Sequence, residues 1–165
     1  MFQKIKPEEI ADNTFQLINN DWTLIAAGNS KKYNMMTASW AGMGILWNKR
    51  VVFIFIRPTR YTYEFTEESD IFTLNFFEEK YRSVLNLCGS KSGRDIDKMK
   101  EPGLTPLEEN GAIYFEEARL ALVCKKIYFQ DLIPSQFLDS HIESHYPNQD
   151  HHRMYIGEIL SAYRK

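Results

Sequence analysis

The chain has 165 residues, and its 20 Lys and Arg against 22 Asp and Glu give a formal charge of −2 at pH 7. Acidic and basic residues are interspersed, so no basic region exists that would bind nucleic acid nonspecifically, and we expect no nucleic-acid partner. The length fits a single domain over residues 1–165 that buries its core without disulfides or metal.

No apolar run approaches the length of a membrane span, and residues 1–10 hold no apolar segment followed by a cleavage site. We therefore expect a cytoplasmic protein with no membrane contact. Cys88 and Cys124 could form one bridge, but free thiols are the default in a reducing compartment.

The first predicted elements are a short helix and two strands. Pro7 and the two acids after it suit a first helical turn. A strand is predicted over residues 21–28, between an Asn-Asn-Asp cluster and a Gly-Asn-Ser turn. A second strand is predicted over residues 35–41, where Ala38 and Ser39 leave room for another group to approach the backbone. A sheet crossing or barrel corner needs the same small residues, so both interpretations stay open.

Residues 50–56 (RVVFIFI) have no polar break after the arginine, which is typical of a strand covered on both faces. Pro58 ends this strand. Arginines and hydroxyl residues follow at its end: Arg57, Thr59, Arg60, Tyr61 and Thr62. An arginine matches phosphate or carboxylate with two parallel hydrogen bonds, so the sequence predicts an anion-binding rim. The alternative is that these arginines pair with surface acids nearby.

Beyond the rim, the pattern predicts a helical turn over residues 63–68, a strand over 71–77 and a helix over 78–87. The segment 89–95 (GSKSGRD) carries two serines, a lysine and an arginine just before a further helical turn predicted over 96–100. Free backbone N–H groups at a helix start favour an anion, so this segment is a candidate phosphate cradle. It lacks the glycine spacing of a Walker motif, and its second serine or its aspartate could simply cap the helix.

The remaining strands are predicted over residues 113–115, 118–129 and 153–163, with a hairpin turn over 109–112 and a polar, irregular segment over 130–150. Short strands, long excursions and inserted helices predict a mainly β fold, an antiparallel barrel with flanking short helices. A parallel doubly wound sheet would need a regular alternation of strands and helices, which this sequence lacks.

All four histidines lie between residues 141 and 152. His141 and His145 are four residues apart with Glu143 between them, so a divalent metal site is conceivable, and a metal-dependent hydrolase using residues 139–152 is one hypothesis. The spacing does not match HExxH, and Pro147 indicates a loop, so we expect no metal.

Two other side chains could take part in chemistry. His152, at the start of the last predicted strand, faces either a pocket or the surface. Cys88 lies near Lys91 and Arg94, which would lower the pKa of its thiol and favour a nucleophile. No histidine or acid stands near Cys88 in the sequence to complete a catalytic dyad.

Four segments occur in order: residues 33–40 (YNMMTASW), 56–65 (IRPTRYTYEF), 88–98 (CGSKSGRDIDK) and 152–158 (HRMYIGE). Together they resemble the flavin reductase family, the FMN-binding split-barrel proteins that include flavoredoxin, over nearly the whole chain. The resemblance implies a homodimer of six-stranded antiparallel split β-barrels with Greek-key topology, each binding one FMN near the dimer interface.

The resemblance also implies a set of site residues. Along the isoalloxazine ring it places Thr37, Ala38, Ser39 and Trp40. Around the ribityl chain and phosphate it places Arg57, Arg60, Tyr61, Thr62, Ser90, Lys91, Ser92 and Arg94. The same segments add Asn34, Met36, Thr59, Cys88 and Gly89 to the expected FMN-binding residues. His152 would sit near the ring or the nicotinamide as the one candidate catalytic residue, with His151 as the alternative for its position.

The implied activity is reduction of flavin by NADH or NADPH. A hydride passes from the nicotinamide to the flavin, whose ring accepts it, while the protein stacks and orients the rings. The alternative is a flavoredoxin-like electron-transfer flavoprotein that takes electrons from a redox protein partner.

Overall fold

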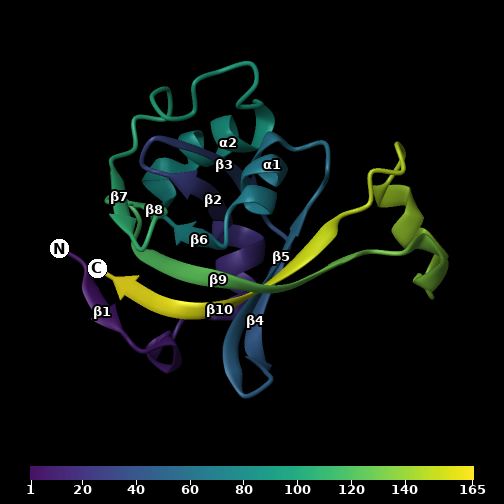
Figure 1. The fold of residues 1–165 in the computed structure, drawn as a ribbon, viewed down its shortest axis with the longest axis horizontal. Coiled ribbons are helices and arrows are strands. Elements are labelled where there is room, and N and C mark those ends of the chain that lie inside the picture. Colours follow the sequence, from purple (N-terminus) through teal and green to yellow (C-terminus); the bar gives the residue numbers. More distant parts are fainter.

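The structure is a computed structural model that describes all 165 residues. Eight strands form one antiparallel sheet in the order β3-β2-β6-β9-β10-β5-β4, with β1 paired to the end of β10 (Figure 1). These strands are β1 (Gln3–Ile5), β2 (Thr23–Asn29), β3 (Lys32–Ala38), β4 (Ala41–Leu46), β5 (Lys49–Ile56), β6 (Ile71–Phe76), β9 (Leu120–Asp131) and β10 (Arg153–Arg164). A separate hairpin joins β7 (Pro106–Glu109) to β8 (Ala112–Phe115).

The expected mainly β, antiparallel fold with flanking short helices is confirmed, but the main sheet has eight strands and not six. The difference arises at β10, whose 12 residues are long enough for three partners. β9 pairs along most of β10. On the other side of β10, β5 pairs with residues 153–158 and β1 pairs with residues 162–164.

The sheet closes at residues 39–40. β3 and β4 are the two ends of the strand order, yet only Ser39 and Trp40 separate them in the chain. A link this short holds the two ends together, so the sheet curves into a barrel. The single strand predicted over residues 35–41 is therefore wrong, and its small residues lie at a barrel corner.

Two hydrophobic cores lie on opposite faces of the sheet. Along β9, Leu120, Leu122 and Cys124 point into the larger core, whereas Ala121 between them belongs to the second core. The second core also contains buried residues of α2 (Arg82–Ser90) and β8. Burial on both faces explains why β9 carries a nearly continuous apolar run.

β5 differs from β9, although its sequence predicts the same burial on both faces. Val52, Ile54 and Ile56 are fully buried, but Phe53 and Phe55 between them are only half-buried. No layer of the chain covers this outward face completely, so the prediction is wrong for β5.

Helices α1 (Tyr61–Glu68) and α2 both pack against β2 and β3 (Figure 1). α1 begins two residues before the predicted turn, and α2 begins at Arg82, after a short 3-10 turn. The helix predicted over residues 96–100 does not form. The amide of Ile96 bonds back to Ser92 and that of Lys100 to Asp97, which closes separate turns.

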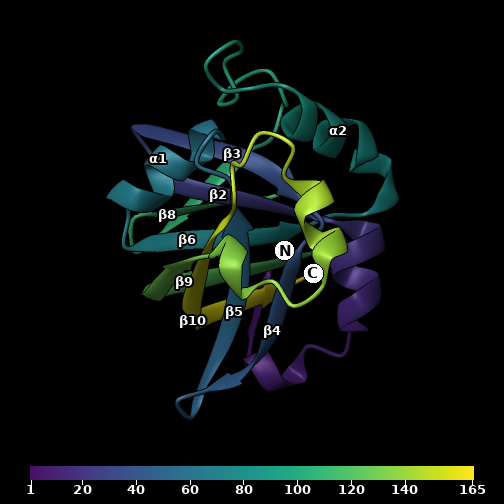
Figure 2. The ribbon, with the colours of Figure 1, turned by 90° about the vertical axis from the view of Figure 1, so that its right-hand side faces the viewer.

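The other predicted strands are confirmed to within two residues at each end. The irregular segment between β9 and β10 contains two 3-10 turns, including η5 (Ser140–His145), and projects away from the barrel. Figure 2 shows this segment crossing in front of β5. None of the helices combines the length and the apolar character that a membrane crossing requires.

Gly157 of β10 gives the first prediction. A Cβ atom there would lie 2.4 Å from Cζ of Phe72, a fully buried ring in the larger core. Gly157→Ala should therefore lower the free energy of unfolding by roughly 1–3 kcal/mol through overpacking, measured by urea denaturation. Gly44→Ala is the matched control, because nothing lies within 4 Å of its added Cβ. Equal stability of the two variants would contradict the packing described here.

Candidate functional site

Two cavities lie next to each other along β3, and Arg60 lines both of them. The first cavity has a volume of about 210 Å³ and is lined by Met36, Thr37, Ala38, Ser39, Trp40, Phe55, Arg57, Arg60 and His152. The second has a volume of about 250 Å³ and is lined by Asn34, Thr59, Arg60, Tyr61, Thr62, Ser90, Lys91, Ser92, Gly93, Asp95 and Lys98. Together they reach the size of a site for a small organic ligand.

Most residues expected at the site line one of these cavities, although they come from four separate segments of the chain. The expected residues that line neither cavity are Cys88, Gly89 and Arg94. The lining residues that were not individually expected are Phe55, Gly93, Asp95 and Lys98, although the last three belong to the segment 88–98.

Arg60 stands between the two cavities without a carboxylate partner. Its guanidinium donates to the backbone oxygens of Gly89 at 2.9 Å and Cys88 at 3.4 Å, both at the end of α2. Burial and the neighbouring Arg57 lower the pKa of Arg60 from its ordinary value. An arginine that is partly desolvated and unpaired favours an anionic ligand.

Arg57 and Arg94 behave differently, because each has an acid. Arg57 lies 2.7 Å from Asp150 and donates to the backbone oxygen of His145 at 2.8 Å. Arg94 pairs with Glu64 and lies over the Tyr61 ring. For Arg57 the alternative interpretation, pairing with an acid of the protein, is therefore the one that the structure supports, whereas Arg60 has no such acid.

Lys98 ends the segment 88–98 but was not among the expected binding residues. Its side chain lies at the wall of the second cavity, and the residue is only 4% exposed. The ammonium donates to the backbone oxygens of Met35 at 2.9 Å and Cys88 at 2.8 Å, and no carboxylate pairs with it. Burial lowers the pKa of Lys98 to about 8. An ammonium has three donors, so one remains for a ligand.

Backbone N–H groups add to the second cavity. The first N–H groups of α1 have no partner within the helix, and Tyr61 and Thr62 line the cavity. The anion-favouring helix start is therefore that of α1, not a helix over 96–100. At Gly93 a Cβ would come within 2.1 Å of Oδ1 of Asn34, so only glycine lets this turn close over the cavity.

The first cavity has a polar corner and a largely apolar wall. Ser39 and Trp40 stand outside the strands, and their N–H groups make no hydrogen bond within the protein. Thr37 is different, because its hydroxyl donates to the backbone oxygen of Leu85 at 2.6 Å. Thr37 can therefore accept a hydrogen bond from a ligand but has no free hydroxyl hydrogen to offer.

His152 is 8% exposed and forms part of the wall of the first cavity. Its Nδ1 lies 2.8 Å from the hydroxyl of Tyr146, and its ring packs at 5.2 Å from that of Trp40. Burial and the nearby Arg57 lower the pKa of His152 to about 4. At neutral pH the imidazole is therefore uncharged. His151 packs on Tyr146 and does not line the cavity, so of the two histidines only His152 lies at the candidate site.

Cys88 is not a nucleophile. Its side chain is fully buried, and burial raises the pKa of its thiol to about 11, opposite to the direction that nearby Lys91 and Arg94 predict. What Cys88 contributes is its backbone oxygen, which holds Arg60 and Lys98.

The histidine-rich segment does not assemble a metal site. His141 pairs with Asp139, and His151 with Glu143, but no group of three or more His, Cys, Asp or Glu side chains comes together. The hypothesis of a metal-dependent hydrolase therefore has no ligand set in this structure.

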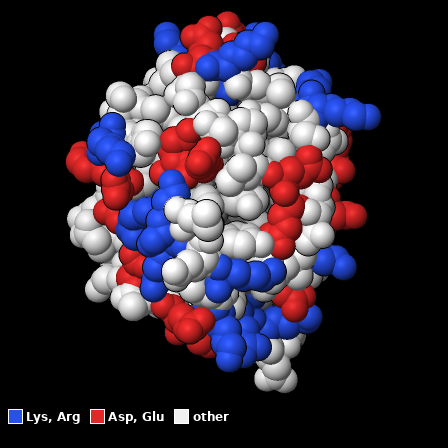
Figure 3. All heavy atoms as spheres, turned by 90° about the vertical axis from the view of Figure 1, so that its left-hand side faces the viewer, with Lys and Arg blue, Asp and Glu red and all other residues white.

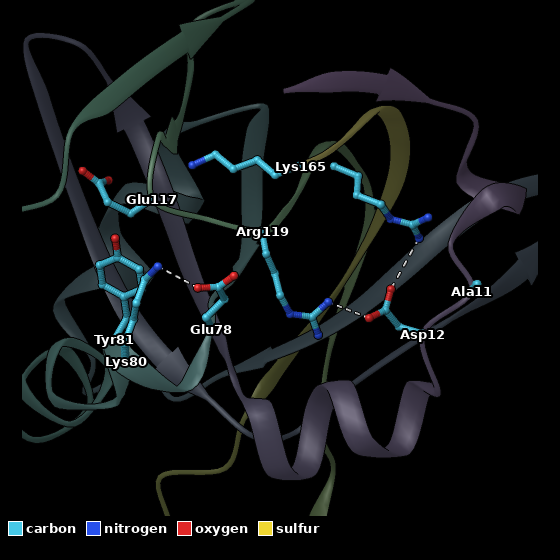
Figure 4. Close-up of a pocket in the computed structure, with 9 residues that line it drawn as sticks. Ala11, Asp12, Glu78, Lys80, Tyr81, Glu117, Arg119 and Lys165 are labelled. Carbon is cyan, nitrogen blue, oxygen red and sulfur yellow. Dashed lines mark hydrogen bonds and ion pairs between the residues drawn. The ribbon is translucent and has the colours of Figure 1, made fainter. Parts of the chain in front are cut away.

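A wider hollow of about 570 Å³ lies near the C-terminus (Figure 4). Most of its charges pair with one another: Asp12 pairs with Arg119 and Arg164, and Glu78 pairs with Lys80. Figure 3 shows acidic and basic side chains interspersed over the neighbouring face. Of its cations only Lys165 has no acid, and the hollow also carries three acidic side chains of its own, so it is less suited to an anion than the second cavity.

Comparison with known proteins identifies the family of the chain. Residues 15–165 match the family model of the flavin reductase like domain. The chain belongs to this flavin reductase-like family. No curated protein matches the sequence at a significant level.

Solved structures share the fold of this flavin reductase-like protein. A flavoredoxin from Methanosarcina acetivorans has a TM-score of 0.68 and 22% identity, over 99% of this chain and 76% of its own. An FMN-binding domain of a flavin reductases-like enzyme from Shewanella baltica has a TM-score of 0.70 and 18% identity, over 99% and 77%. An NADH:FAD oxidoreductase from Streptomyces globisporus, in complex with NAD and FAD fragments, has a TM-score of 0.66 and 17% identity, over 88% and 74%. At such identities the likeness establishes the fold.

Proposed function

We propose that the chain, acting as one domain over residues 1–165, binds FMN and catalyses its reduction by NADH or NADPH. The observation that carries this proposal is the second cavity, where Arg60, Lys91 and Lys98 have no carboxylate partner. A phosphate ester carries between one and two negative charges at neutral pH, which matches this surplus of cations against the single lining acid, Asp95.

The residues fit FMN in both cavities. In the second, Arg60, Lys98 and the N–H groups at the start of α1 would bind the phosphate, and Ser90 and Ser92 offer hydroxyl groups. In the first, the backbone at Ser39 and Trp40 would meet the polar edge of the ring, with Phe55 on the apolar wall. Arg60 lies where the two cavities join, so it would contact the phosphate end of the ribityl chain.

A bound flavin supplies the redox chemistry, because its ring accepts a hydride from a reduced nicotinamide. The protein binds and orients both rings, and no acid–base side chain is required. His152 is neutral at pH 7, so it would orient a ring rather than donate a proton.

Exposed apolar side chains support the further proposal of a homodimer. Ile45 and Trp47 at the tip of the β4–β5 hairpin and Phe129 of β9 are all more than half exposed. Such a surface favours association with a second copy of the chain. We also propose a cytoplasmic location and no nucleic-acid or membrane partner.

The test is anaerobic stopped-flow mixing of the FMN-loaded protein with NADH or NADPH. The proposal predicts that the flavin absorbance bleaches within seconds with at least one of them. If dithionite reduces the bound flavin but neither NADH nor NADPH does, the reductase proposal is wrong. The flavoredoxin-like alternative, an electron-transfer protein that takes electrons from a redox protein partner, would then be supported. A protein that retains no FMN would refute both.

A further inference from the structure

Tyr146 and His152 form a buried pair beside the first cavity. Tyr146 directly follows η5, in the segment that projects from the barrel, and is only 4% exposed. Its hydroxyl lies 2.8 Å from Nδ1 of His152, which stands just before β10 and lines the cavity. The projecting segment therefore contributes to the site through Tyr146, although Tyr146 does not line the cavity.

The hydrogen positions follow from the partners. The hydroxyl of Tyr146 has one hydrogen, and Nδ1 of His152 is its only hydrogen-bond acceptor in the protein. A neutral imidazole that accepts at Nδ1 carries its own hydrogen on Nε2. Nε2 of His152 has no hydrogen-bond partner within the protein. It is not fully buried either, because the only fully buried side-chain N or O atom without a partner is Oε2 of Glu109. Nε2 is therefore accessible to solvent, and His152 lines the first cavity.

Several charged and titratable side chains surround this pair. The guanidinium of Arg57 lies 4.9 Å from the centre of the Tyr146 ring, and Asp150 partly offsets its charge through their ion pair. The ring of His151 packs at 4.6 Å from Tyr146. Burial and Arg57 both disfavour a positive charge on His152.

We propose that Tyr146 is a positioning residue that holds His152 in the Nε2–H tautomer, so that His152 donates a hydrogen bond into the first cavity. The ligand that this donor suits is a planar heteroaromatic ring with an acceptor oxygen at its edge. The identity of that ring rests on the proposed function. No proton is transferred, because His152 acts only as a neutral donor.

The test begins with the ligand-free protein, by NMR of ¹⁵N-labelled histidine side chains. The expected result for His152 is one neutral tautomer with the hydrogen on Nε2 and no titration between pH 5.5 and about 8. In Tyr146→Phe this fixed tautomer should give way to averaging of the two nitrogens. Tyr128→Phe is the matched control, because the Tyr128 hydroxyl bonds to Gln130 and the residue is exposed and lines neither cavity.

FMN titration then tests the consequence. Tyr146→Phe should weaken FMN binding about fivefold, the effect of one neutral hydrogen bond, while Tyr128→Phe leaves it unchanged. A hydrogen on Nδ1 of His152, a charged imidazole at pH 7, or an unchanged tautomer in Tyr146→Phe would overturn the inference. A wild-type protein with the expected tautomer and no affinity for FMN would refute the proposed function but support this inference.

Discussion

Replacing Arg60 with alanine is expected to lower the affinity for FMN about 10- to 100-fold, because a charge-assisted hydrogen bond contributes roughly 1.5–3 kcal/mol. Arg60 is the one cation that lines both cavities, and it has no acid to satisfy it in the protein. Isothermal titration of the ligand-free variant with FMN measures the loss directly. The FMN affinity of Arg60→Lys should fall between those of the wild-type protein and Arg60→Ala, since lysine keeps the charge but loses the two parallel hydrogen bonds of the guanidinium.

Arg50→Ala is the matched control for this variant. Arg50 pairs with Glu8 at the surface and lines neither cavity, so its loss should leave FMN affinity unchanged. Because Arg60 also bonds to the end of α2, thermal unfolding of Arg60→Ala must confirm that the fold persists. A folded Arg60→Ala variant with wild-type affinity for FMN would show that the phosphate does not bind in the second cavity.

Lys98→Met should lower FMN affinity to a similar extent at pH 7 and should also abolish its pH dependence. The ligand-free pKa of Lys98 is about 8, so wild-type affinity should fall as the pH rises through 8 and the ammonium loses its proton. The methionine variant has no such group, and its affinity should stay flat across that range. Lys100→Met is the matched control, because the Lys100 side chain is exposed and pairs with Asp97.

The same lysine predicts a signature in stability without any ligand. The pKa of Lys98 is about 8 in the folded protein against 10.5 ordinarily, so the unfolded chain binds more protons between these values. The contribution of Lys98 to the free energy of unfolding should therefore rise with pH across this window, by up to about 3 kcal/mol relative to Lys98→Met. The pKa of Cys88 is coupled to Lys98, so the two proteins are compared in a Cys88→Ala background, which removes this thiol from the difference. A difference that does not change with pH would show that Lys98 is not buried as described.

The strands were predictable because their signals are local. Apolar runs bounded by turn residues place β2, β6, β9 and β10 correctly to within two residues. The closure of the barrel was not predictable from residues 35–41, because nothing local shows that the chain passes there from one end of the sheet to the other.

The candidate site was predictable as segments but not as interactions. Arg57 and Arg60 occur in the same sequence context, but only Arg57 has an acidic partner. That partner, Asp150, lies 93 residues away along the chain, so the sequence did not reveal the difference. Lys98 lies within the segment 88–98 that carries the resemblance, but it was not among the expected binding residues, because a lysine among charged residues is typical of a solvated surface. Its burial arises only when the turns after α2 fold back over β3 and place its ammonium against Met35.

The central claim is that a phosphate and a planar ring occupy the two joined cavities, and riboflavin, which lacks the phosphate, tests it most directly. Parallel titrations of the ligand-free protein at pH 7 should show FMN binding at least about 30-fold more tightly than riboflavin, since more than one charge-assisted contact is lost. Arg60→Ala and Lys98→Met should each narrow that ratio. Equal affinities of the wild-type protein for FMN and riboflavin would contradict the account.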